Sequence, residues 1–254
     1  GLGLICPEQC GPEAAWSGLA APDKPGILAA GHLLDVLNHL RGTKLLLPPK
    51  TQRQTGIVQH PDMADVRGQP QARLALEVAA SGGHNLLMNG PPGAGKSMLA
   101  ARLPGLLPEL QSQERREISV IESLSSPRGG IRLADQRPFR APHHSASMAA
   151  LIGGGRHAKP GEISLAHCGV LFLDELPEFS RQALDALRQP IETGRVEVAR
   201  AEAHVSYNAD FQLIAAMNPC RCGHADDPDL ACHRLPLCRQ EYLSKLSGPL
   251  FDRF

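Results

Sequence analysis

The sequence predicts an α/β fold in which a parallel β-sheet lies between two layers of helices. Three apolar runs lead to this prediction, at residues 86–88, 170–173 and 211–217, and each ends at a glycine-rich or polar segment. Buried parallel strands are continuous apolar runs because helices cover both faces of their sheet. The three runs are therefore expected to form strands of one three-layer core.

A phosphate-binding loop, the P-loop, follows the first run. Residues 90–97 fit the pattern G-x-x-x-x-G-K-[ST], with an apolar run before it and helix-forming residues after it, which disfavours a chance glycine-rich turn. Its glycines let backbone N–H groups turn towards phosphates, and the helix that begins at Lys96 directs its positive end at them. We expect Lys96 to neutralise the β- and γ-phosphates of ATP and the Ser97 hydroxyl to ligate Mg²⁺. The predicted nucleotide-binding residues are Gly90, Pro91, Pro92, Gly93, Ala94, Gly95, Lys96 and Ser97.

Two carboxylates, Asp174 and Glu175, end the second run. Ligands of open parallel sheets bind at the carboxyl ends of the strands. Asp174 is therefore expected to hold Mg²⁺ through water, and Glu175 to polarise the water that attacks the γ-phosphate. A solvated acid pair that caps the strand is the alternative, and the P-loop makes it the weaker one.

The third run closes on Asn218 and Pro219. An amide at this strand end could orient water against the γ-phosphate, but an Asn-Pro turn explains the same two residues equally well. Before this run, apolar and polar residues alternate over 195–200 and 203–207, which predicts a β-hairpin. A short helix is expected over 180–188.

Upstream of the P-loop, a helix is expected to start near Gln69, with Pro70 in its first turn, and to end at Gly82 and Gly83. Farther along the chain, residues 137–144 contain two prolines and can form neither a plain helix nor a central strand. They are expected to form a functional loop.

Composition excludes some classes of function. Lys and Arg total 26, as do Asp and Glu, so the net charge is zero. This balance argues against a surface basic all over, but it allows a locally basic pore. Apolar runs stay well short of the roughly 20 residues of a membrane span, and no secretory signal opens the chain. A cytoplasmic protein without a membrane partner is expected.

Four of the seven cysteines crowd the C-terminal part of the chain: Cys220, Cys222, Cys232 and Cys238. In a cytosolic protein such a group suggests a metal site or free thiols before disulfides. Four thiols suffice for one tetrahedral Zn²⁺, with His224 and His233 as rival ligands. The spacing does not contain a clean C-x2-C pair, and reduced, unliganded thiols remain an equal alternative.

The motifs together resemble the magnesium-chelatase-like AAA+ ATPases of bacteria, the ComM/YifB group. The resemblance covers residues 65–254 almost continuously, and 1–47 are similar to the end of the Lon-protease-like domain that precedes the ATPase in this group. Between them, 48–64 are predicted to be a polar linker, with disorder as the alternative. The shared segments are 66–69, 82–87, the P-loop, 138–144, 160–167, 170–179, 216–220 and 246–250.

The resemblance implies a ring-forming motor, usually a hexamer, that binds ATP between subunits and acts on single-stranded or branched DNA in its pore. Members are regarded as DNA motors, and branch migration during natural transformation is the expected role. Asn218 would be the sensor-1 residue. Arg253 would reach a neighbour's γ-phosphate; a structural arginine paired with Asp252 or another local acid is the alternative.

The pore would be lined by a helix-2 insert at 137–155 and a pre-sensor-1 hairpin at 195–207. There Arg195, Arg200 and the 140–144 loop would meet phosphates. The chain departs from the group in its cysteine motif, where Arg221 replaces a proline and Arg234 falls where the last cysteine is expected.

The chain begins Gly-Leu-Gly and stops before the lid helices of the group, so we expect a fragment. A chelatase-type remodeller of a protein partner is the first alternative function. A truncated module that binds nucleotide with little turnover is the second.

Overall fold

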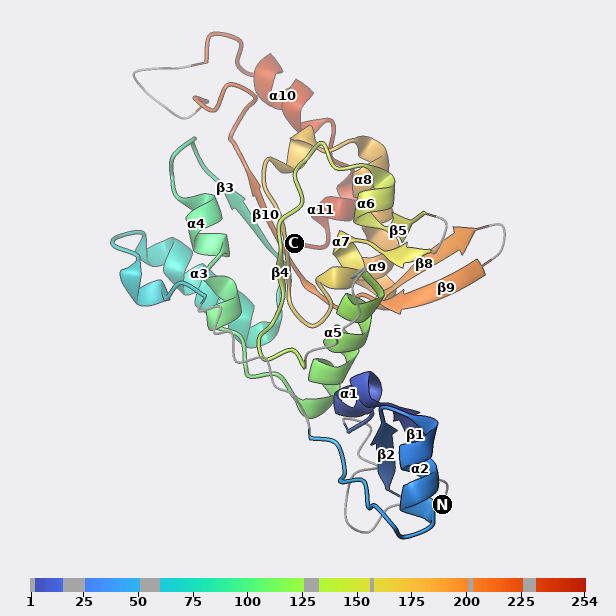
Figure 1. Cartoon of the computed structure of the whole chain (residues 1–254). Coiled ribbons are helices and arrows are strands. Elements are labelled where there is room, and N and C mark those ends of the chain that lie inside the picture. The colour runs from blue at the N-terminus through green and yellow to red at the C-terminus, as the bar shows by residue number, and fades with distance from the viewer. Residues whose placement is uncertain are drawn as a thin grey trace. The chain divides into compact units, whose positions relative to one another are not determined.

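The computed structural model describes residues 3–15, 26–50, 60–125, 133–155, 158–200, 203–225 and 232–254, without the side chains of 199, 200 and 203 (Figure 1). The chain divides into two compact units, one of 1–57 with 126–135 and the other of 58–125 with 136–254. Most of the predicted linker lies outside the described residues, and the predicted domain bounds stay predictions. Within the described ranges, none of the helices combines the length and the apolar character needed to cross a bilayer.

The smaller unit contains a two-stranded parallel sheet of β1 (Leu4–Pro7) and β2 (Ile27–Ala30). Its helices are α1 (Gly11–Ala15) and α2 (Leu33–Leu40), with a 3-10 turn at Glu8–Cys10. The apolar residues of α2 recur at helical spacing, at Leu33, Val36, Leu37 and Leu40. Its leucines are largely exposed, however, with Leu33 at 76 % and Leu40 at 68 %, and only Val36 is buried.

The larger unit is built on a four-stranded parallel sheet in the order β3-β10-β7-β4. These strands are β3 (Leu86–Asn89), β10 (Gln212–Met217), β7 (Val170–Leu173) and β4 (Phe139–Arg140). Every residue of the two inner strands, β10 and β7, is buried, as their mainly apolar sequences predict. The α/β fold with a parallel sheet is thus confirmed.

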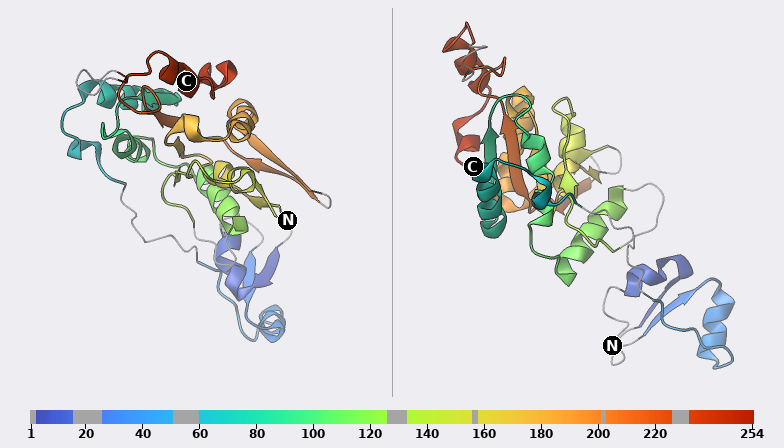
Figure 2. Two further views of the ribbon diagram at one scale, coloured as in Figure 1. Left: turned by 90° about the horizontal axis from the view of Figure 1, so that it is seen from above. Right: turned by 90° about the vertical axis from the view of Figure 1, so that its left-hand side faces the viewer.

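Two clusters of buried side chains lie one on each face of the sheet. Helices cover both faces, which gives three layers (Figure 2). Alternate residues of one strand enter different clusters, because successive side chains of a strand point to opposite faces. Phe172 and Ile214 pack with Leu76 of α3 (Pro70–Gly82) and Leu99 of α4 (Lys96–Ala100). The other cluster joins Leu171 and Leu213 to Leu184 and its neighbours.

The remaining helices of this unit are α5 (Ser112–Ser125), α6 (Met148–Leu151), α7 (Glu162–Leu165), α8 (Arg181–Ala186), α9 (Arg188–Thr193), α10 (Leu237–Leu243) and α11 (Gly248–Phe251). Short 3-10 helices lie at Met63–Asp65, Leu103–Gly105 and Leu176–Glu178. The helix predicted over 180–188 is α8, and α9 follows it at once. The predicted helix after Gln69 is α3, which has Pro70 in its first turn and ends at Gly83 with φ +64°.

The predicted hairpin is present as β8 (Arg195–Arg200) and β9 (Ala203–Asn208), an antiparallel pair. A second small antiparallel pair consists of β5 (Gly153–Gly154) and β6 (Lys159–Pro160). The proline-rich segment 137–144 contributes only the two-residue edge strand β4, in agreement with the exclusion of a central strand there.

Candidate nucleotide site and cysteine cluster

The P-loop connects the end of β3 to α4, and its lysine lies at the centre of the site. Lys96 Nζ donates hydrogen bonds to the carbonyl oxygens of Gly90 (2.7 Å) and Pro91 (2.9 Å) and to Asn218 Oδ1 (3.1 Å). Burial lowers the pKa of Lys96, while Asp174 and Glu175 raise it in part. The predicted sensor side chain and the P-loop lysine are therefore in direct contact.

The topology of the sheet explains this contact. Because β10 lies between β3 and β7, the end of β10 falls between the P-loop and the paired carboxylates. Met217 pairs with Asn89, and the Gly90 N–H donates to the Met217 carbonyl at 3.2 Å. Asn218 thus follows directly after the residue that touches the start of the P-loop.

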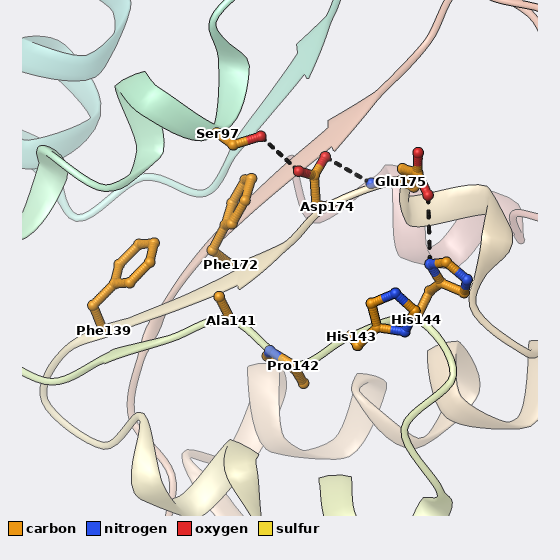
Figure 3. Close-up of a pocket in the computed structure, with 9 residues that line it drawn as sticks. All are labelled: Ser97, Phe139, Ala141, Pro142, His143, His144, Phe172, Asp174 and Glu175. Atoms are coloured by element: carbon orange, nitrogen blue, oxygen red, sulfur yellow. Dashed lines mark hydrogen bonds and ion pairs between the residues drawn. The ribbon is translucent and has the colours of Figure 1, made fainter. Parts of the chain in front are cut away.

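The two predicted Mg²⁺ ligands also meet. Ser97 Oγ donates to Asp174 Oδ2 at 2.6 Å, and the second carboxylate oxygen of Asp174 accepts the Glu175 N–H at 2.9 Å (Figure 3). Hydroxyl and carboxylate oxygens are the ligands that Mg²⁺ takes, often beside substrate phosphates. The donor set at the ends of α4 and β7 therefore fits the ion that the sequence predicts.

A cavity of about 390 Å³ opens over these residues. Its volume lies within the range of small-molecule sites, and most of its lining is polar. It is lined by Pro92, Gly93, Ala94, Gly95, Lys96, Ser97, Met98, Asp174, Glu175, Met217 and Asn218. The described structure therefore gathers six of the eight predicted P-loop residues, the two carboxylates that follow β7 and the amide that follows β10 around one space, while Gly90 and Pro91 do not line it.

Glu175 has a partner that the sequence did not predict. Its backbone is left-handed (φ +52°), and its Oε2 lies 3.4 Å from His144 Nδ1. Strand β4 pairs in parallel with β7, so the segments that follow the two strands, which carry His144 and Glu175, leave the same end of the sheet from neighbouring strands. A second cavity of about 470 Å³ lies beside this pair (Figure 3).

The arginines expected to meet phosphates in a pore differ in their surroundings. Arg140 donates two hydrogen bonds to the Glu162 carboxylate, at 2.6 and 2.7 Å, so its guanidinium is already engaged. Arg195 is exposed on β8, whereas the side chain of Arg200 lies outside the described part of the structure. The 140–144 loop contributes His144 to the site rather than a free cation.

Arg253 lies away from the P-loop cavity. Its guanidinium forms an ion pair with Glu192, and its carbonyl oxygen accepts a hydrogen bond from Asn85 Nδ2 at 2.8 Å. Asn85 immediately precedes β3, at the end opposite the P-loop. The acid beside Arg253 is therefore Glu192 of α9, which is one of the other acids that the structural alternative allows besides Asp252.

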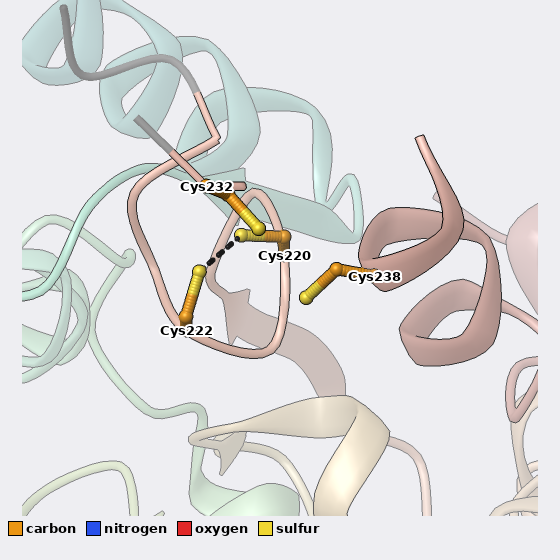
Figure 4. A group of neighbouring side chains, drawn as sticks. All are labelled: Cys220, Cys222, Cys232 and Cys238. Carbon is orange, nitrogen blue, oxygen red and sulfur yellow. Dashed lines mark hydrogen bonds between the residues drawn. The ribbon is translucent and has the colours of Figure 1, made fainter. Parts of the chain in front are cut away.

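The four C-terminal cysteines converge (Figure 4). Their Sγ atoms all lie within 4.8 Å of one another, with Cys220 and Cys222 at 3.2 Å, and all are free thiols. Four sulfurs at 2.3 Å around a tetrahedral Zn²⁺ would be about 3.8 Å apart. Backbone N–H groups, that of Cys222 foremost, lower the pKa of Cys238, whereas burial raises the pKa of Cys220. Cys238 completes the group, and His233 is not among its members.

A second cluster, of Glu117, His167 and Cys168, also has the composition of a metal site. His167 Nδ1 accepts the Asp210 N–H at 3.2 Å, and Nε2 lies 2.8 Å from Glu117 Oε2. A neutral imidazole that accepts at Nδ1 carries its proton on Nε2, so this ring has no free lone pair for a metal. Burial raises the pKa of Cys168 to about 12. The cluster is therefore a satisfied structural network.

Comparison with known proteins agrees with this site. A family model described as magnesium chelatase, subunit ChlI, matches residues 62–254. The chain is 51 % identical to YifB of Escherichia coli over 230 residues, which are 90 % of this chain and 45 % of YifB. It is 50 % identical to the competence protein ComM of Haemophilus influenzae over 227 residues, 87 % of this chain and 44 % of ComM.

A Mycobacterium tuberculosis protein is 47 % identical over 252 residues, 98 % of this chain and 49 % of that protein. The chain thus spans just under half the length of these relatives. The family match covers the larger unit from residue 62 onward, including the P-loop, both carboxylates and the cysteine cluster. The chain belongs to the magnesium chelatase family, in its ComM/YifB-like branch, and carries the AAA+ ATPase core of that family.

Proposed function

We propose that this chain is the ATP-hydrolysing core of a cytoplasmic DNA motor that assembles as a ring, usually a hexamer. One observation supports the proposal that the chain hydrolyses ATP. The P-loop lysine touches Asn218 while the P-loop serine touches Asp174, so phosphate, metal and sensor groups converge on one cavity.

In this mechanism each residue has a separate task. Lys96 and the P-loop N–H groups hold the phosphates, and Ser97 and Asp174 hold Mg²⁺, which screens the phosphate charge. Glu175 orients the attacking water once its carboxylate leaves His144. Asn218, already bonded to Lys96, would detect whether the γ-phosphate is present.

DNA as the substrate is supported by the relatives and by the hairpin. ComM is named a competence protein, and competence concerns the uptake of DNA. The β8–β9 hairpin, with Arg195 exposed at its base, is an element that could contact a backbone of phosphates. Branch migration during natural transformation is the proposed role of the assembled ring.

The proposal predicts that DNA stimulates ATP hydrolysis. Steady-state turnover of the natural full-length protein should rise several-fold with single-stranded or branched DNA, and the stimulation should fall steeply with salt because phosphate contacts release counterions. Lys96→Ala protein is the control for contaminating ATPases. Turnover that DNA leaves unchanged at every salt concentration would contradict the DNA assignment, but not the ATPase assignment.

A second function is favoured by the description of the matching family model, which names a chelatase subunit. Such a ring would remodel a protein partner to insert Mg²⁺ into a porphyrin. In that case a protein, and not DNA, would stimulate turnover in the same assay. A module that binds nucleotide without hydrolysing it would show affinity for ATP and no turnover under either condition.

We further propose that Cys220, Cys222, Cys232 and Cys238 bind one Zn²⁺. Mutual distances under 4.8 Å and the absence of disulfides among the described cysteines support a closed four-sulfur site. Elemental analysis of protein purified without chelators should give about one zinc per chain, as a single four-ligand site requires. A content near zero would favour reduced, unliganded thiols.

A further inference from the structure

The turn that carries two of the cysteines packs against the P-loop. Gly223 has φ +87°, and its N–H donates to the Cys220 carbonyl at 2.9 Å, which closes the turn. A Cβ atom added at Gly223 would lie 2.6 Å from Cγ and Cδ of Pro92. Since real Cβ atoms do not approach other atoms so closely, only glycine lets the turn and the P-loop touch here.

The turn also lies close in sequence to Asn218, the proposed sensor residue. Asn218 binds Lys96, and only Pro219 separates it from Cys220. The Pro219 carbonyl accepts a hydrogen bond from Arg239 Nε of α10 at 3.1 Å. The helix that supplies Cys238 thus also contacts the residue next to Asn218.

Segment 218–223 is therefore held at two ends. Its first residue is fixed by the P-loop lysine, and its last by Pro92 of the same loop. Between them, the sulfurs of Cys220 and Cys222 lie beside Cys238 of α10 and Cys232 (Figure 4). A metal ion that joins the four sulfurs would tie this segment to α10 and press it against the nucleotide site.

We propose that the metal on the four cysteines controls ATP turnover, by holding Asn218 on Lys96 and Gly223 on Pro92. This inference rests on the zinc site and the ATPase activity proposed above. The sheet needs no metal, because β7 and β10 are buried between two helix layers. Metal loss is therefore expected to lower turnover strongly and to change nucleotide affinity little, since Lys96 and the P-loop N–H groups remain.

The first test removes the metal from the natural full-length protein. A zinc-selective chelator, with Mg²⁺ in excess, should lower turnover at least tenfold, and added Zn²⁺ should restore it. Cys222→Ser should lose zinc and turnover together, whereas Cys10→Ser, an exposed thiol of the smaller unit, should lose neither. Nucleotide affinity and cooperative thermal unfolding are measured on each sample.

The second test breaks the contact but keeps the thiols. Gly223→Ala should retain one zinc per chain and still lose turnover at least tenfold, because its Cβ would displace Pro92. Gly42→Ala is the matched control, since Gly42 has a similar φ of +75° with no atom within 4 Å of the added Cβ.

Each outcome separates the proposals. Full turnover in zinc-free protein, or in Gly223→Ala, would overturn the proposal that the metal controls turnover. It would leave the ATPase assignment intact. If the wild-type protein contains no zinc, both the proposed zinc site and its control of turnover are overturned. If the wild-type protein contains zinc but hydrolyses no ATP under any condition, the control of turnover and the proposed function are both overturned.

Discussion

Replacement of Glu175 by glutamine is expected to lower ATP turnover by about 10²–10⁴-fold while ATP affinity stays near that of the wild type. General-base assistance of the attacking water contributes this much, and an amide cannot provide it. The phosphates would still be held, because Glu175 contacts His144 and not the P-loop lysine. Glutamine at 175 has nearly the same shape, so the site should keep its packing.

Replacement of Lys96 by alanine should instead lower nucleotide affinity and turnover together. Loss of charged hydrogen bonds to the phosphates is expected to weaken ATP binding by roughly 100-fold. Binding of a fluorescent nucleotide, measured beside steady-state turnover, distinguishes the two variants. Glu178→Gln is a matched control. It removes a carboxylate only three residues beyond Glu175, and that carboxylate pairs with Lys245. An equal loss of affinity in Glu175→Gln and Lys96→Ala would show that Glu175 holds the nucleotide instead of activating water.

The strands that position these residues were predictable because runs of apolar residues indicate which strands are buried. Strand β7 is a continuous apolar run and β10 is one from Leu213 onward, and each is buried at every residue. The carboxyl ends of such strands share one edge of a sheet, which brings Asp174 and Asn218 together without any further information. Residue type alone could not decide between a sensor and a turn at Asn218; its 3.1 Å contact with Lys96 supports the sensor interpretation.

Contacts that depend on loop approach were not predictable. The pairing of His144 with Glu175 depends on how the loops that follow β4 and β7 approach each other, which no motif encodes. Arg140 looks like a free cation in the sequence, yet it is engaged by Glu162, 22 residues away. Helix α5 escaped prediction because it is strongly charged and buries only Ile118, Ser119 and Ile121.

Substitution of Arg253 offers a direct test of the proposed ring assembly. It is absent from the lining of its own P-loop cavity, and its backbone is fixed at the opposite end of β3 by Asn85. In the ring it would complete the site of the neighbouring subunit, where an arginine supplied in trans accelerates phosphoryl transfer by about 10³–10⁵-fold. Arg253→Ala and Lys96→Ala proteins should each be nearly inactive alone. When mixed, some interfaces join an intact P-loop to an intact Arg253, and partial turnover should return.

Glu192→Gln is the control that separates this role from a structural one. Glu192 is the ion-pair partner of Arg253, and both side chains are about half exposed. Such a pair contributes at most about 1 kcal/mol to stability. If Arg253 served only that pair, Glu192→Gln would be as harmful as Arg253→Ala; if Arg253 acts across the interface, Glu192→Gln should keep nearly full turnover. Size-exclusion chromatography with differently tagged subunits must show that mixed rings form, because mixed rings without restored turnover would rule out action across the interface.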